Sequence, residues 1–201
     1  MKKGEKRRQE LLQIAYRMFL TQGYENTSVD EIIEAAGIAK GTYYYYFQSK
    51  EQMLEAVIGM MIEAEATAAR RVLASEMPTP RKLVGIIASA RPTQDEQPIE
   101  AALNQPENAL LHKRMRERLL DAFVPLLSEA VEEGVRGGLF TCDHIPERVK
   151  MLLLLGSELF DEGRFTEADA DVFIDVMETL LGAAPGSMGF IRALIPQRGR
   201  A

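Results

Sequence analysis

Apolar residues recur along the chain at the three- and four-residue spacing of an amphipathic helix. The first such stretch covers residues 9–22, and Gly23 after it is a typical helix stop. One face of this predicted helix carries Leu11, Ile14, Ala15, Met18 and Phe19. No stretch shows the alternation of apolar and polar residues that a β-strand needs, so the pattern predicts an all-α protein.

A second and a third short helix follow, separated by a glycine. Ser28 and Glu31 have the spacing of a capping box, which predicts a helix over about 29–36. Gly37 interrupts that helix, and the next one is predicted over about 39–46. Two helices joined by a short turn with glycine form the pattern of a helix-turn-helix, whose second helix enters the major groove in DNA-binding proteins.

The later apolar stripes predict a larger helical body. A long helix is expected from residue 50 to about 76, because Pro78 and Pro80 cannot continue it. Further helices are predicted over 81–90, 99–104, 107–134, 145–160, 166–181 and 188–194, with a polar loop over 91–97. The long helix would therefore link an N-terminal three-helix head to this body.

The chain divides on this interpretation into a DNA-binding head, residues 1–50, and a helical body, residues 51–201. The whole chain has a formal net charge of −6, which is unusual for a protein that binds nucleic acid. Residues 1–50 nevertheless contain eight Lys or Arg and six Asp or Glu, so the positive charge is concentrated in the head. Residues 1–8 are predicted to form a basic, largely frayed arm, with Lys6, Arg7 and Arg8 available to phosphates.

Composition also limits the compartment and the class of activity. The lone Cys142 cannot form an internal disulfide, and no apolar run is long enough to span a membrane, so we expect a cytoplasmic protein. Cys142 and His144 have no third or fourth ligand nearby, which favours an ordinary loop over a metal site. No nucleophile–base pair and no phosphate-binding glycine loop is present, so neither an enzyme nor a cofactor is predicted.

Four consecutive tyrosines, Tyr43 to Tyr46, dominate the third predicted helix. Successive helical side chains point about 100° apart, so only some of these rings can face the core. The others must meet solvent or a partner. Exposed phenols beside lysines suit a surface that binds phosphate oxygens and base edges.

The motifs of this region resemble the DNA-binding domain of the TetR family of transcriptional regulators. The resemblance covers residues 9–56, about a quarter of the chain. It is carried by Ala15, Phe19, Gly23-Tyr24, Thr27-Ser28, Ile32, Ala36-Gly37-Ile38, Lys40-Gly41-Thr42, Tyr44, Phe47 and Ser49-Lys50-Glu51. It implies an all-α homodimer that binds double-stranded DNA.

The resemblance also implies individual DNA contacts. Thr27 and Ser28 would touch phosphate at the start of the second helix. Base edges in the major groove would be approached by Lys40, Gly41, Thr42 and Tyr45, and backbone phosphates would be held by Tyr44, Tyr46 and Lys50. Two positions depart from the family pattern. Ala39 replaces a capping serine, and Tyr43 replaces an inward leucine, so Tyr43 and Phe47 are expected in the core.

The body is expected to supply dimerisation and effector binding. The last two long helices have apolar stripes too broad for one dry side, and in the family they form half of a four-helix bundle across a two-fold axis. The predicted interface comprises Val149, Leu152, Leu153, Leu159, Phe160, Val172, Phe173, Val176, Met177 and Leu180. A mainly apolar pocket is assigned to Met60, Met61, Met115, Phe123 and Met151, for each of which ordinary core is the competing interpretation.

Together these features predict a repressor that binds a near-palindromic operator as a dimer and is released by a small, mainly apolar effector. Two alternatives remain open at this stage. The first is a DNA-binding dimer that has no small-molecule effector or is regulated by a protein partner. The second is an activator, because the direction of the effect on transcription depends on where the operator lies relative to a promoter.

Overall fold

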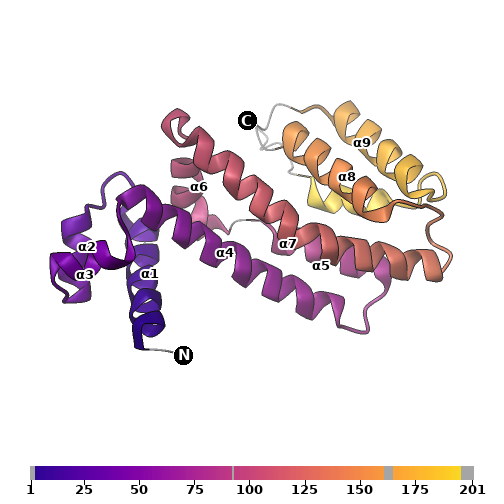
Figure 1. Ribbon diagram of the computed structural model, residues 1–201. Coiled ribbons are helices and arrows are strands. Elements are labelled where there is room, and N and C mark those ends of the chain that lie inside the picture. The colour runs from indigo at the N-terminus through magenta and orange to yellow at the C-terminus, as the bar shows by residue number, and fades with distance from the viewer. Residues whose placement is uncertain (1–2, 92, 161–164, 196–201) are drawn as a thin grey trace. The chain divides into compact units, whose positions relative to one another are not determined.

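The computed structural model describes residues 3–91, 93–160 and 165–195, and every regular element in these ranges is helical (Figure 1). The α-helices are α1 (Lys3–Gln22), α2 (Val29–Ala36), α3 (Lys40–Tyr46), α4 (Lys50–Leu73), α5 (Thr79–Ser89), α6 (Gln97–Leu103), α7 (Ala109–Arg136), α8 (Ile145–Phe160) and α9 (Glu167–Leu181). Short 3₁₀ helices are η1 (Gln94–Glu96), η2 (Pro106–Asn108) and η3 (Gly189–Leu194). The predicted all-α fold is confirmed. Within the described ranges, no helix is both long and apolar enough to cross a membrane.

The chain folds into two compact units. The first contains the described residues up to 64 together with 93–118, and the second contains 65–91 and the described residues from 119 onward. Helices α4 and α7 contribute residues to both units. The described part of the predicted head lies wholly in the first unit, which also includes the segment from η1 to the first turns of α7.

The helix-turn-helix in the first unit is built from local signals that the sequence already contains. The Ser28 hydroxyl accepts a hydrogen bond from the Glu31 amide, and the Glu31 carboxylate accepts one from the Ser28 amide, so the predicted capping box is confirmed. Gly37 ends α2 with φ 61° and ψ 42°, a left-handed conformation that favours glycine. Ala39 begins α3 without a side-chain cap, as its methyl group requires.

Helix α1 begins at Lys3, so the expectation of a frayed arm is wrong for residues 3–8. Two contacts with the end of α3 account for the longer helix. The Arg8 guanidinium lies 5.1 Å from the centre of the Phe47 ring, and the Tyr46 hydroxyl lies against the backbone at Gly4. Met1 and Lys2, the remainder of the predicted arm, lie outside the described residues.

The segment after α5 is more ordered than its polar composition indicates. The predicted loop over 91–97 contains η1 and the start of α6, although residue 92 lies outside the described ranges. Helix α6 packs against α1. The Tyr16 hydroxyl donates to one Glu96 oxygen at 2.9 Å, and the other Glu96 oxygen accepts from the Thr93 amide at 2.8 Å. These hydrogen bonds attach the segment to α1.

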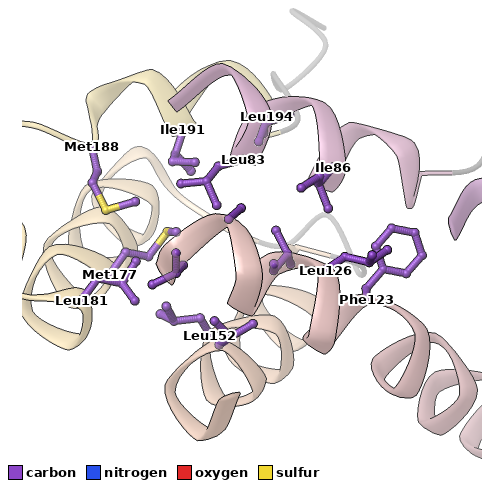
Figure 2. Close-up of a cluster of buried hydrophobic side chains, with 14 of the residues drawn as sticks. Leu83, Ile86, Phe123, Leu126, Leu152, Met177, Leu181, Met188, Ile191 and Leu194 are labelled. Atoms are coloured by element: carbon purple, nitrogen blue, oxygen red, sulfur yellow. The ribbon is translucent and has the colours of Figure 1, made fainter. Parts of the chain in front are cut away.

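The second unit has one apolar core, part of which is drawn in Figure 2. Leu83 and Ile86 of α5 lie on the side of the core where η3 supplies Ile191 and Leu194 (Figure 2). Helices α7, α8 and α9 complete this core with Phe123, Leu126, Leu152, Met177 and Leu181 (Figure 2). The short helix predicted over 188–194 is confirmed as the 3₁₀ helix η3, and its packing explains why so short a segment is ordered.

Buried polar groups in the second unit are used to join elements. The Lys82 ammonium of α5 lies 2.7 Å from a Glu133 oxygen of α7, and its side chain is 9% exposed. The buried Glu178 carboxylate accepts hydrogen bonds from the amides of Gly186 and Met188, both at 2.8 Å. Glu133 thereby holds α5 against the core, and Glu178 holds the residues before η3.

Candidate nucleic-acid interface

The four tyrosines of α3 occupy different environments, as their helical spacing predicts. Tyr43 is completely buried, Tyr46 is half-buried, Tyr44 is 44% exposed and Tyr45 is 80% exposed. The rings of Tyr45 and Tyr46 meet edge to face with centroids 4.9 Å apart. Tyr45, the exposed member of this pair, offers both an apolar edge and a hydroxyl to a partner.

Tyr43 and Phe47 hold α3 against the rest of the first unit. Their ring centroids are 6.1 Å apart, and Phe47 is 1% exposed. The Tyr43 hydroxyl donates to the Ser49 carbonyl at 3.4 Å, and burial, followed by the nearby Tyr44 and Glu51, raises the pKa of Tyr43 to about 12. The prediction that Tyr43 and Phe47 belong to the core is confirmed, and Tyr43 is therefore not a DNA contact.

Lys40 stands at the exposed start of α3 and is paired with a carboxylate of α2. Its ammonium lies 2.9 Å from Asp30 Oδ1, and this hydrogen bond raises the pKa of Lys40. Gly41 is exposed with no atom near its missing side chain, and Thr42 is half-buried. The sequence analysis missed Asp30, since no helical periodicity relates positions ten residues apart across a turn.

Lys50, the first residue of α4, is attached to the loop after α1. Its ammonium lies 4.2 Å from the centre of the Tyr24 ring and donates to the Glu25 carbonyl at 3.2 Å. Burial is the main cause that raises the pKa of Tyr24, and the negative charges of Glu51 and Glu25 add to it. The phenol therefore remains neutral beside the cation. The lysine is thus held in one place on the surface while keeping further N–H donors.

The two residues assigned to the start of α2 differ in accessibility. Ser28 is exposed, and hydrogen bonds with Ser28 lower the pKa of Glu31 below its ordinary value. Thr27 is fully buried, and its hydroxyl donates to the Gly23 carbonyl at 2.8 Å. The assignment of Thr27 to phosphate is therefore wrong, because its side chain completes the end of α1. A threonine four residues after a helix-stopping glycine was the available signal for this role.

The five residues assigned to an effector pocket do not share one environment. Met60 and Met61 are half-buried and Met115 is buried in the first unit, where the Met60 sulfur accepts from Gln13 Nε2 at 3.1 Å. Phe123 is buried in the second unit. Met151 is 60% exposed on α8, so its assignment to an internal pocket is wrong. Its position in a continuous apolar run concealed which face it occupies.

The residues assigned to the dimer interface divide between core and surface. Val149, Leu152, Phe173 and Met177 are buried in the core of the protomer, while Leu153, Leu159, Phe160, Val176 and Leu180 are half-buried and Val172 is exposed. Beside Val172, the exposed large apolar residues of α8 and α9 are Met151, Leu154 and Leu155. Both helices are apolar on two sides, as predicted, but only some of the residues that face outward are those assigned to the dimer interface.

Cys142 lies in the turn between α7 and α8. It is half-buried, and burial raises the pKa of its thiol. The neighbouring Asp143 carboxylate accepts from Arg148 at 2.7 Å, which lowers the pKa of Asp143. No cluster of three His, Cys, Asp or Glu side chains with the geometry of a metal site occurs in the part of the chain that the structure describes.

A helix-turn-helix whose second helix carries exposed phenols and an exposed lysine is typical of DNA-binding regulators, and comparison with known proteins shows that this is the class. The family model described as "Bacterial regulatory proteins, tetR family" matches residues 11–57. The repressor KstR2 of Rhodococcus jostii (strain RHA1) is 30% identical over 143 residues, which cover 68% of this chain and 69% of the relative. KstR2 of Mycolicibacterium smegmatis is 28% identical over 137 residues, covering 64% and 66% of the two chains.

The chain belongs to the TetR family of bacterial transcriptional regulators. Its fold is similar to that of solved structures: the crystal structure of RolR with resorcinol has a TM-score of 0.64 at 19% identity, with 98% of each chain covered. Salmonella enterica GusR has a TM-score of 0.61 at 20% identity and covers 91% of this chain and 99% of its own. At these identities the likeness concerns the fold alone.

Proposed function

We propose that this protein represses transcription by binding a near-palindromic operator as a homodimer in the cytoplasm, and that a small, mainly apolar effector releases it. The observation that carries the proposal is the surface of α3, where Tyr45 is 80% exposed beside Tyr44 and Lys40. A large exposed phenol has no use in the folding of the protomer. It does suit base edges in a major groove.

The contacts divide into those that position the head and those that read sequence. Lys40, Gly41, Thr42 and Tyr45, at the exposed start and face of α3, approach base edges. Ser28, Tyr44, Tyr46 and Lys50 bind backbone phosphates around it. Two heads in one dimer would enter successive major grooves roughly 34–36 Å apart, so the operator has two similar halves in inverted order.

The dimer forms through the outward apolar residues of α8 and α9. Met151 and Val172 are 60% and 59% exposed, and Leu154 and Leu155 are 37% and 38% exposed. A second copy would remove this surface from water, which stabilises association by about 25 cal/mol for each Å² of apolar area buried. The proposed interface extends to the half-buried apolar residues of the same two helices, which are Leu153, Leu159, Phe160, Val176 and Leu180.

The effector binds in the helical body, where Phe123, buried in the core of the second unit, remains a proposed contact. Met60, Met61 and Met115 belong to the first unit. The effect on DNA binding requires a coupling free energy of only ~1–3 kcal/mol. The hydrogen bond from Tyr16 to Glu96 supports a route for it, because any movement of η1 and α6 is transmitted directly to α1.

Two alternative functions are compatible with the same structure. A DNA-binding dimer without a small effector, or one controlled by a protein partner, would keep the surface of α3 and the outward faces of α8 and α9. An activator would differ only in the position of its operator. The curated relatives named as repressors favour repression.

The test is fluorescence anisotropy with labelled duplexes that tile the DNA beside the gene for this protein, measured against scrambled duplex over a salt series. We expect one near-palindromic duplex to bind at least about 1,000-fold more tightly than scrambled DNA. Tyr45→Ala should remove most of that preference. Lys50→Ala should weaken binding to both duplexes and reduce the slope of log affinity against log salt concentration by about one. Equal binding of wild-type protein to every duplex, including duplexes selected from random sequence, would contradict the proposal.

A further inference from the structure

The only charged side chain on α3 is Lys40, because the sequence of this helix is KGTYYYY. That single cation is paired with Asp30 of α2 at 2.9 Å. With the pair formed, the helix that reads DNA presents no net charge of its own. Its exposed surface then consists of phenols, one hydroxyl and backbone.

We propose that Asp30 is a specificity-determining residue that lowers the affinity of the head for non-operator DNA by occupying Lys40. The inference rests on the proposed function, because it concerns discrimination between operator and other sequences. Non-specific binding to DNA comes almost entirely from cations that neutralise phosphates. A lysine held by a carboxylate contributes less to that attraction, and the carboxylate itself repels phosphates.

The geometry shows that the pair can be exchanged. The side chains of Lys40 and Asp30 are 63% and 74% exposed, and exposed ion pairs contribute little to stability. At the operator, a base edge placed at the right position replaces Asp30 as the partner of Lys40. At other sequences no such acceptor is placed there, so the pair persists and the recognition helix gains nothing from its lysine.

Neighbouring groups do not duplicate the role of Asp30. The adjacent Glu31 carboxylate accepts hydrogen bonds from the Ser28 backbone and is part of the cap of α2. Lys50 is held by the Tyr24 ring and the Glu25 carbonyl, so its charge is not modulated by Asp30 in the same way. Discrimination by this mechanism therefore depends on one carboxylate and one ammonium group.

A purely structural role for the pair, as a link between α2 and α3, makes a different prediction. Loss of a link would lower the stability of the head and weaken binding to all DNA. Loss of the proposed device would instead strengthen binding, mainly to the wrong DNA. The direction of the change thus separates the two roles.

The experiment compares Asp30→Asn with Glu34→Gln, which removes an exposed carboxylate from the same helix one turn further on. Affinity is measured by anisotropy over a salt series for two duplexes, the tightest one selected by wild-type protein from random sequence and its scrambled version. We expect Asp30→Asn to bind scrambled duplex about tenfold more tightly, with a salt slope steeper by about one. Binding to the selected duplex should improve by less than about threefold, so the preference falls.

Glu34→Gln should strengthen binding to both duplexes by the same small factor and leave the preference unchanged. In a Lys40→Met background, Asp30→Asn should behave like Glu34→Gln, because no lysine remains to be released. Urea unfolding of each variant confirms that the head is folded.

Two results overturn the inference in distinguishable ways. If wild-type protein prefers the selected duplex and Asp30→Asn changes that preference no more than Glu34→Gln does, or weakens binding to both duplexes, Asp30 does not determine specificity. If wild-type protein has no preference for any selected duplex, the proposed function fails, and the inference fails with it.

Discussion

Four residues of identical chemistry occupy consecutive positions on α3, and burial alone gives them different roles. Tyr43 is a core residue whose hydroxyl donates to a carbonyl, whereas Tyr45 offers most of its ring to a partner. Helical geometry made this division predictable from sequence, since adjacent side chains cannot share a direction. The capping box of Ser28 and Glu31 was equally predictable, because both of its hydrogen bonds are local.

Thr27 marks the limit of such local reasoning. Its position next to Ser28 predicts a surface residue at a helix start, yet its hydroxyl completes the preceding helix instead. Asp30 is a second case, because its pairing with Lys40 depends on the angle between α2 and α3. The sequence predicts the elements of the interface, but the pairings that cross the turn depend on the three-dimensional arrangement of the helices.

At the residue scale, Ala39→Ser should stabilise the head. Ala39 already has the extended backbone of an N-cap, and α3 has no side-chain cap, so a serine hydroxyl can accept an amide of its first turn. We expect the free energy of unfolding to rise by ~1 kcal/mol, measured by urea denaturation at fixed protein concentration. Ala39→Val, which adds atoms without an acceptor, is the control, and equal stabilisation by both would refute the capping explanation.

At the scale of elements, contacts distant in sequence determine where helices begin and end. Residues 3–8 join α1 because Tyr46, the last residue of α3, and Phe47, the next residue, lie against them. The predicted loop over 91–97 contains η1 and the start of α6, where Glu96 accepts a hydrogen bond from a tyrosine 80 positions earlier. The interiors of the long helices were predicted well from their periodicity. The start of α1 was not, because its partners are distant in sequence, whereas η1 has a local signal that sequence analysis missed, the capping box of Thr93 and Glu96.

The ion pair between α5 and α7 provides the test at this scale. Glu133→Ala leaves the Lys82 ammonium, with a side chain 9% exposed, without its counter-charge. We expect the free energy of unfolding to fall by ~3 kcal/mol in urea denaturation. The double variant Lys82→Met, Glu133→Leu should recover most of that loss, because it removes the buried charge as well. A loss of the same size in the double variant would mean that packing, rather than charge, accounts for the effect.

At the scale of the whole molecule, the broad apolar stripes of α8 and α9 predicted that each helix has two apolar sides. They did not indicate which side faces the core of the protomer. Val149 and Phe173 proved to be core residues, while Met151 lies on the surface. Both helices contain charged residues, but their apolar residues cover more than one face. Periodicity alone therefore does not show which of these faces turns to the core.

Met151→Glu tests the outward face directly. A carboxylate at a residue 60% exposed should leave the protomer folded but place a charge in the proposed dimer interface. We expect a monomer in sedimentation velocity at micromolar concentration and ~100-fold weaker operator binding, because the two heads no longer act together. Leu110→Glu, at an apolar residue of α7 that is 69% exposed, is the matched control. A dimeric Met151→Glu protein would place the interface elsewhere.

The contact of the first turn of α1 with Tyr46 has a practical consequence for anyone who prepares this protein. Gly4 lies beside the hydroxyl of Tyr46, so the first described turn of α1 is at the end of the helix proposed to read DNA. A polyhistidine tag joined ahead of this turn would be close to it in sequence and would bring its own cationic groups to the duplex below neutral pH. Binding assays therefore require a carboxyl-terminal tag or complete proteolytic removal of an amino-terminal one.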